Sequence, residues 1–342
     1  MPTAYATASC FALHDRPDHP ENARRLFAAQ QGLLDAGLNE RLAEVDALPV
    51  SDDLLLAAHA GAYLHRLGQL AQGRNSMLGP DTYVTPESYD VARTAVGSVV
   101  GAVHAVLEGR AANALAAVRP PGHHATPTQA MGFCLLNNIA LGACYARREF
   151  DLERVLIVDY DVHHGNGTQD IFYDDPSVLF VSTHQWPLYP GTGAIADVGS
   201  ALGRGMTINV PLPPGTGDRG YAAVFERIVW PAAERFQPEL ILVSAGFDAH
   251  WDDPLAQMGL SLAGYSHLTR ELIRMAQTLC NGRIVFVLEG GYNLIVLRYA
   301  WADVARALLG DDESADPLGA GPRGEPDIAS VLARVTTVHQ LD

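Results

Sequence analysis

The feature that most constrains the fold of this chain is a series of short apolar runs separated by segments with helical periodicity. Runs of this length, bounded by turn residues, are typical of strands that are buried on both faces of a sheet. The alternation of strands with helices predicts βαβ units and a mostly parallel sheet covered by helices, that is, an α/β protein. The predicted strands are Ala114–Val118, Val155–Asp159, Val178–Ser182, Met206–Val210, Leu240–Ser244 and Ile284–Leu288.

Helical patterns occupy the segments between several of these strands and most of the first hundred residues. The predicted helices are Glu21–Ala36, Asp52–Gln72, Pro86–Glu108, Leu135–Arg148, Tyr221–Phe236 and Tyr265–Leu279. No repeat, low-complexity tract or Gly/Ser linker interrupts the 342 residues, so we expect one domain over residues 1–342. Residues 310–325 are rich in Gly, Pro and acids, and we expect a loose surface segment there, followed by a short helix.

The composition narrows the class of protein. A hydrophobic content of 48% with 18% charged residues is typical of a soluble globular protein with a sizeable core. The net charge of -16 argues against direct binding to nucleic acid and is compatible with cationic partners such as lysine-rich peptides or polyamines. No run approaches ~18 uncharged apolar residues, so no membrane span is expected.

Targeting signals and cysteines point to the cytoplasm. The N-terminus lacks the pattern of a signal peptide, a basic segment followed by a long apolar core. The four cysteines have no CxxC spacing, so we expect free thiols in a reducing cytoplasm, and none is predicted to bind a metal.

Polar side chains follow four of the predicted strands at the point where each strand ends. Because the carboxyl ends of parallel strands open on one edge of a sheet, ligands bind in the crevice there. Four polar strand ends are more than chance would place, so we expect an active site at this edge. The four segments read RPPGHHA, DYDVHHGNG, SAGFDAHWDDP and LEGGYN.

Three of these residues have the pattern of metal ligands. Asp161 and His163 are two residues apart, which places both side chains on one face of an extended chain. With Asp248 from another strand end they form a set of three protein ligands and an open position, which is typical of a catalytic divalent ion. Zn²⁺, Fe²⁺ and Co²⁺ all suit this set. Taken singly, Asp161 could equally cap a turn and His163 could be an ordinary loop histidine.

The longer motifs resemble the histone deacetylase superfamily. The motifs PPGHHA, MGFCLLNN, DYDVHHGNGTQDIFY, SAGFDAHWDDP and LEGGYN occur in the family's order, from about His19 to Ala307. HPENARRL and the Asn of HHGNG are similar to class II and bacterial members. The resemblance implies the arginase–deacetylase fold, with one eight-stranded parallel sheet flanked by helices on both faces. It also implies an enzyme, a zinc-dependent amidohydrolase that removes acetyl groups from amines with a metal-activated water.

The resemblance also implies roles for the residues of the site. Asp161, His163 and Asp248 match the metal ligands. Among the catalytic residues, His124 matches the general base and acid, and the Tyr292 hydroxyl matches the group that polarises the scissile carbonyl. The remaining matches are His123 with its carboxylate partner Asp159, and Asn166 beside His124. Because Asn166 is neutral, it should leave the imidazole of His124 less basic than a carboxylate would.

Substrate and potassium sites follow from the resemblance alone. Phe133, which follows Gly132, and Tyr189 match the two aromatic walls of an acyl-lysine tunnel, and Asp81 matches a rim carboxylate that accepts substrate N–H groups. A structural K⁺ would be bound by carbonyl groups of Asp159, Asp161, His163 and Thr183, together with the Asp159 carboxylate and the Ser182 hydroxyl. The implied substrates are acetylated lysine peptides or proteins, or small acetylated amines.

Three alternatives remain on the sequence. Ureohydrolases share the fold but use two metals, and Gly165 and His250 stand where further carboxylates would be needed. Acetylpolyamine amidohydrolases can place a glutamate in the DDPL loop, where this chain has Leu255, and this favours acyl-lysine. A protein that binds acyl-lysine without hydrolysing it would normally lack a ligand or the tyrosine, and both are present. The sequence leaves a monomer and a homo-oligomer equally open.

Overall fold

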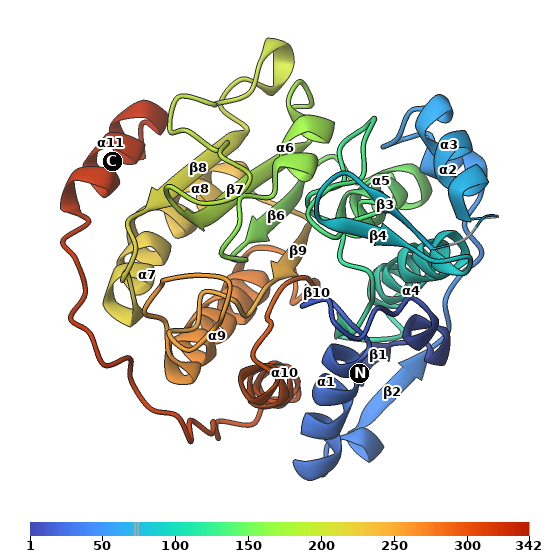
Figure 1. The fold of residues 1–342 in the computed structure, drawn as a ribbon. Helices are drawn as coiled ribbons and strands as arrows, with labels where there is room; N and C mark the ends of the chain where they lie inside the picture. Colours follow the sequence, from blue (N-terminus) through green and yellow to red (C-terminus); the bar gives the residue numbers. More distant parts are fainter. Residues whose placement is uncertain (72, 74, 342) are drawn as a thin grey trace.

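The computed structural model describes residues 1–71, 73 and 75–341, and its centre is one sheet of eight strands (Figure 1). Every neighbouring pair of strands in this sheet is parallel. This confirms the α/β class and the eight-stranded sheet. In sheet order the strands are β2 (Leu42–Val45), β1 (Thr3–Ala6), β5 (Asn113–Ala116), β10 (Ile284–Leu288), β9 (Leu240–Ala245), β6 (Val155–Asp159), β7 (Val178–Gln185) and β8 (Thr207–Leu212).

All six predicted strands are present, but the first hundred residues contain strands that the prediction missed. β1 and β2 have only four residues each and pair with one another at one side of the sheet. A four-residue strand is too short to show a period against the helices around it. A separate antiparallel hairpin of β3 (Ser76–Leu78) and β4 (Thr82–Val84) was missed for the same reason.

Helices cover the sheet in two layers. α4 (Ser88–Leu107) and α5 (Asn138–Phe150) pack on each other and contact β5 and β9 respectively. In the second layer α1 (Arg24–Asp35), α10 (Leu294–Leu308) and α9 (Leu262–Leu279) lie side by side (Figure 1).

The remaining helices differ in detail from the prediction. The predicted helix Tyr221–Phe236 begins earlier, as α7 (Asp218–Val224), and continues through a π-helical turn (Phe225–Val229) into α8 (Trp230–Phe236). The predicted helix Asp52–Gln72 is wrong as one element. It is divided into α2 (Asp52–Leu55) and α3 (Gly61–Ala71), and Gln72 lies outside the described residues.

The C-terminal tail has no helix or strand between residues 311 and 325 and is followed by α11 (Ala329–His339), which contacts β8. Several hydrogen bonds nevertheless attach it to the domain. The Asp316 carboxylate accepts from the Ala263 N–H, and the Glu325 carboxylate accepts from the N–H of Gly220. The segment is therefore irregular but anchored, and its looseness stays a prediction.

Within the part of the chain that the structure describes, one helix, α4, is long and apolar enough to cross a membrane, by length and composition only, with a mean hydropathy of 1.3. The structure buries 72% of this stretch within the protein, mainly against α5 and the sheet. The core helix of a layered protein passes the same test, so this single helix is weak evidence for a membrane span.

Close packing between α1 and α10 depends on one glycine. A Cβ atom on Gly32 of α1 would lie 1.9 Å from the carbonyl oxygen of Arg298 on α10. Gly32→Ala should therefore force the two helices apart, although alanine normally stabilises a helix by ~1 kcal/mol over glycine. We expect a loss of about 1–3 kcal/mol, measured as a lower thermal midpoint. Gln31→Ala, on the exposed face of the same helix, is the control, and a midpoint of Gly32→Ala at or above wild type would contradict this packing.

Candidate active site

The sheet order brings the four polar strand ends together. β5, β10, β9 and β6 are consecutive neighbours at the centre of the sheet, although they are far apart in the chain. Each is followed by one of the polar segments, so their side chains meet at one edge. The ring centroids of His123 and His124 lie 4.0 Å apart, and those of His124 and His163 lie 6.0 Å apart. The predicted histidines therefore share one site.

The three predicted metal ligands converge. The Nδ1 atom of His163 lies 3.1 Å from Oδ1 of Asp161 and 3.2 Å from Oδ2 of Asp248. All three side chains are buried, and one ligand atom of each lies within 4.8 Å of the others. Backbone N–H groups orient the carboxylates, since Val162 donates to Asp248 and Gly290 donates to Asp161. Oδ2 of Asp248 has the ion-pair contact with His163 but no hydrogen-bond partner among the described residues.

Two glycines leave room for this group. A Cβ on Gly246 would lie 2.0 Å from Oδ2 of Asp161, and a Cβ on Gly290 would lie 2.1 Å from Oδ2 of Asp248. Only residues without a side chain fit at these two positions. The orphaned carboxylate oxygen, the space kept open by glycine and the set of one nitrogen and two oxygen ligands fit a divalent cation.

The two adjacent histidines have different partners, as the resemblance implied. Nδ1 of His123 lies 3.0 Å from Oδ2 of Asp159, and Nδ1 of His124 lies 2.8 Å from Oδ1 of Asn166. Burial disfavours a charged His123 ring, but the carboxylates of Asp159 and Asp161 outweigh it and raise the pKa of His123 to about 10. For His124, burial and the positive charges of His123 and His163 hold the pKa well below its usual value. One imidazole is charged and the other is neutral.

A buried glutamate that the prediction missed fixes the turn that holds the histidines. Oε2 of Glu289 accepts from the N–H groups of Gly122 (2.7 Å) and His123 (3.2 Å). Its other oxygen has no hydrogen-bond partner among the described residues, and burial raises the pKa of Glu289 to about 7. Glu289 thereby ties the loop after β5 to the loop after β10. The only sequence signal was a charged residue at the end of an apolar strand.

No cysteine was predicted to bind a metal, and that stays a prediction, but one cysteine lies close to the residues of the site. Cys134 is buried, and its sulfur forms a compact group with ligand atoms of His123 and Glu289. The sulfur lies 3.2 Å from the carbonyl oxygen of Gly132, to which the thiol donates. This residue packs behind the histidines, and the sequence spacing gave no sign of it. All four cysteines are free thiols.

Aromatic residues lie around the opening of the site. The Tyr189 ring centroid is 5.2 Å from that of His124, and the Phe133 ring centroid is 5.8 Å from that of Tyr292. Gly132 lies against the histidine, because a Cβ there would be 2.2 Å from the ring of His124. The predicted walls and the predicted tyrosine thus surround the histidine pair.

The tyrosine loop is fixed by buried charges. The Asp253 carboxylate accepts the N–H of Tyr292 at 2.8 Å. The Arg25 guanidinium stacks over the Tyr292 ring at 4.9 Å and donates to the carbonyl of Gly291 at 2.7 Å. Burial raises the pKa of Tyr292 well above its ordinary value, so its hydroxyl stays protonated.

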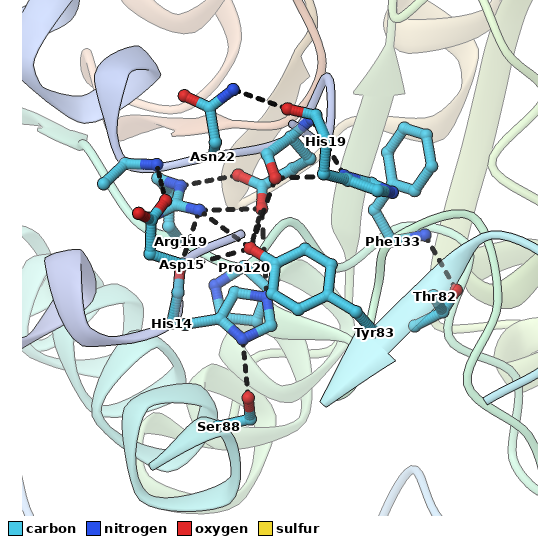
Figure 2. A network of polar contacts seen from close by, with 12 residues as sticks. His14, Asp15, His19, Asn22, Thr82, Tyr83, Ser88, Arg119, Pro120 and Phe133 are labelled. Carbon is cyan, nitrogen blue, oxygen red and sulfur yellow. Dashed lines mark hydrogen bonds and ion pairs between the residues drawn. The ribbon is translucent and has the colours of Figure 1, made fainter. Parts of the chain in front are cut away.

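Arg25 belongs to a buried ion-pair network that the sequence did not reveal, and Figure 2 shows the part of this network around Arg119. The Glu21 carboxylate accepts from Arg25 at 3.2 Å and from Arg119 through two nitrogens, at 2.5 and 2.8 Å. Burial disfavours the charged carboxylate, but the positive charges of the arginines outweigh it and lower the pKa of Glu21 to about 2. Two arginines around one carboxylate fix the N-terminal segment to the strand that leads to the histidines.

The remaining predicted residues lie at the rim and behind the site. Asp81 and Tyr189 line a cavity of about 350 Å³ together with Arg66 and other residues. Leu255 is half-buried in the loop after β9, where its N–H donates to the Asp253 carboxylate.

The residues predicted for potassium lie beside the metal ligands. Ser182 of β7 is paired in register with Asp159 of β6. The Thr183 hydroxyl lies 3.4 Å from the Asp159 carbonyl oxygen, and Ser182 Oγ lies 3.0 Å from Nδ1 of His184. The two strands thus place these three residues side by side, with Asp161 and His163 following directly in the chain.

Comparison with known proteins places the chain in a family. A family model described as "Histone deacetylase domain" matches residues 19–308, which is most of the chain and includes every strand end of the site. The chain belongs to the histone deacetylase family. It is a deacetylase-type amidohydrolase, as the resemblance implied.

Relatives in this family agree in sequence and in fold. The "Histone deacetylase-like amidohydrolase" of Pseudomonas aeruginosa is 43% identical over 304 residues, which cover 88% of this chain and 79% of that protein. The mouse "Polyamine deacetylase HDAC10" is 41% identical over 85% of this chain and 45% of its own length. The crystal structure of the HDA15 HD domain matches with a TM-score of 0.90 and 36% identity over 99% of this chain and 94% of that one.

The converging donor set predicts tight binding of one divalent ion. Adding Zn²⁺ to metal-free protein should raise the thermal midpoint, because an ion at a hundredfold excess over its Kd stabilises the folded state by ~2.7 kcal/mol. Asp161→Asn, which keeps the size of the side chain, should lose most of this shift. Asp252→Asn, an exposed acid in the loop after β9, is the control. Two tightly bound ions per chain, or a wild-type shift in Asp161→Asn, would contradict the assignment.

Proposed function

We propose that this protein is a zinc-dependent hydrolase that removes acetyl groups from the amines of acetylated lysine side chains. The observation that supports this most directly is the meeting of three buried metal-type ligands, Asp161, His163 and Asp248, with one charged and one neutral histidine. Membership of the histone deacetylase family supports the reaction class.

A Zn²⁺ ion held by Asp161, His163 and Asp248 would act as a Lewis acid on the amide carbonyl and would lower the pKa of a water molecule. His124 is the neutral acceptor that takes a proton from the attacking water. Its Nδ1–H donates to Asn166, so its Nε2 is the nitrogen free to accept. The same nitrogen then returns the proton to the leaving amine.

Two further groups stabilise the negative charge that develops on the amide oxygen. His123 keeps its proton because Asp159 lies 3.0 Å away, so it contributes a fixed positive charge beside the reacting carbonyl. The protonated hydroxyl of Tyr292 donates a hydrogen bond to the same oxygen. Electrostatic preorganisation of this kind is the largest contribution in many hydrolases.

In this proposal the residues at the opening of the active site select the substrate. Phe133 and Tyr189 would hold the methylene chain of lysine between their rings, and Gly132 leaves space beside His124. The Asp81 carboxylate would accept N–H groups of the peptide backbone. A K⁺ ion beside Asp159, Ser182 and Thr183 would steady the strand ends below the site.

Removal of the proton acceptor should abolish turnover without unfolding the protein. His124→Ala should lower kcat for an acetyl-lysine peptide by about 10²–10⁴-fold, the contribution of a positioned general base. His65→Ala is the control, since this exposed histidine on α3 has one hydrogen-bond partner, Gln69, among the described residues. Acetate release measures the rate and circular dichroism checks folding. Unchanged turnover in His124→Ala would refute the assignment, and peptide binding without turnover in zinc-loaded wild type would identify a non-catalytic acyl-lysine binder.

An acetylpolyamine amidohydrolase is the second candidate, and two observations favour it. The net charge of -16 attracts polycations, and the mouse relative is named a polyamine deacetylase. We expect kcat/KM to favour an acetyl-lysine peptide over N-acetylspermidine, because Leu255 offers no charge to the distant ammonium group. Leu255→Glu should shift the ratio toward acetylspermidine by about tenfold, and Leu255→Gln, without the charge, is the matched control. A strong wild-type preference for acetylspermidine would overturn the choice of substrate.

A further inference from the structure

Two separate bridges connect Asp81, at the rim, to the tunnel wall Phe133, and Figure 2 shows the bridging residues Thr82 and His19 beside Phe133. The first is the hydroxyl of Thr82 on β4. This oxygen accepts the N–H of Phe133 at 3.0 Å and donates its own hydrogen to the Asp81 carboxylate at 2.8 Å. Thr82 is fully buried, so water does not compete for either bond. One hydroxyl therefore links the rim to the backbone of the wall.

The second bridge is His19, a residue to which the sequence assigned no role. Its Nε2 lies 3.0 Å from the Asp81 carbonyl oxygen, and its Nδ1 lies 3.1 Å from the Glu21 nitrogen. Nε2 faces the acceptor oxygen of Asp81, whereas Nδ1 faces both the N–H and, at 3.0 Å, the carbonyl oxygen of Glu21. The ring is thus fixed at both nitrogens. It packs edge-on against Phe133, with centroids 4.6 Å apart and an angle of 85° (Figure 2).

The wall needs such support because its backbone conformation is unfavourable. Phe133 has a φ of 69°, in the left-handed region that costs a bulky L-residue about 1–2 kcal/mol. A conformation of this kind persists only where the surroundings fix it. The bond from Thr82 to the Phe133 N–H and the ring of His19 are the contacts that do so on the rim side.

The support is itself attached to the buried ion pair. The Tyr83 ring packs against His19, with centroids 4.9 Å apart, and its hydroxyl donates to the Glu21 carbonyl at 3.2 Å. Glu21 is paired with Arg119, at the end of the segment that leads to the histidines. The rim, the wall and the ion pair are therefore one connected unit.

We propose that His19 and Thr82 are positioning residues that determine specificity, by holding the rim Asp81 and the wall Phe133 in one fixed relation. This inference rests on the proposed function. It implies that binding of the peptide backbone at the rim and the chain thickness accepted by the tunnel are set together. The expected preference is for an acetylated amine on a slender, unbranched chain within a peptide, and thicker chains should react more slowly.

The test compares two peptides that differ at one residue, acetyl-lysine or the acetylated amine of 4-aminomethyl-phenylalanine. The measured quantity is the ratio of kcat/KM for the slender substrate to that for the thick one, which does not depend on the fraction of folded enzyme. His19→Ala and Thr82→Val should each reduce this ratio at least about fivefold, the effect expected for one lost hydrogen bond. The change should lie mainly in KM for the lysine peptide, because the reacting groups are untouched.

Matched variants separate the coupling from a general structural defect. Thr82→Ser keeps the hydroxyl and should recover the discrimination lost in Thr82→Val, while the exposed His65→Ala should leave the ratio unchanged. Equal wild-type rates on both peptides, or wild-type ratios in both His19→Ala and Thr82→Val, would overturn the coupling and leave deacetylation intact. If wild type loaded with Zn²⁺ hydrolyses neither peptide but does hydrolyse acetylspermidine, the proposed substrate class is wrong and the inference falls with it.

Discussion

The burial of carboxylates at the carboxyl edge of the sheet is the constraint on which the rest of this structure depends. Three fully buried carboxylates lie there: Asp159 at the end of β6, Asp161 just after it, and Asp248 just after β9. Unpaired buried charges of like sign are costly, so each must be compensated by a proton, a cation or hydrogen-bond donors. The surrounding residues supply that compensation in part, through His123, His163 and backbone N–H groups. The orphaned oxygen of Asp248 is the part left for an ion.

The same constraint explains why two neighbouring histidines of one turn have different charges. His123 is close to two of the carboxylates and keeps its proton, whereas His124 is buried, faces the neutral amide of Asn166 and lies beside the positively charged ring of His123. A proton-transfer group and a fixed positive charge are thus obtained from one residue type. The difference arises from the partner that each ring meets, and not from any difference in the residues themselves.

The reactive residues of the site could be predicted because the pattern that marks them lies within a few consecutive residues. Asp161 and His163 are two residues apart after one strand. Glycines next to the strand ends indicate that the backbone there lies close to other groups of the site. The short strands β1 and β2 were not predictable, since four residues show no period against the helices around them. The pairing of Glu21 with Arg119 joins positions 98 residues apart, and nothing in either neighbourhood indicates the partner. The positive φ of Phe133 could not be predicted from the sequence, because a bulky aromatic residue ordinarily avoids this conformation.

The structure separates the groups that react from the groups that select. The reacting residues stand at the ends of four central strands, whose positions are fixed by the sheet and by helices on both faces. The rim residues stand on the small β3–β4 hairpin and the N-terminal segment, outside the main sheet. Buried bonds through Thr82, His19 and Glu21 join the two parts. Apart from the bond from Thr82 to the Asp81 carboxylate, the bonds of Thr82 and His19 end on backbone groups of the wall and rim. Other rim side chains can therefore be exchanged, with a change of substrate preference, while the metal ligands and the histidine pair stay in place.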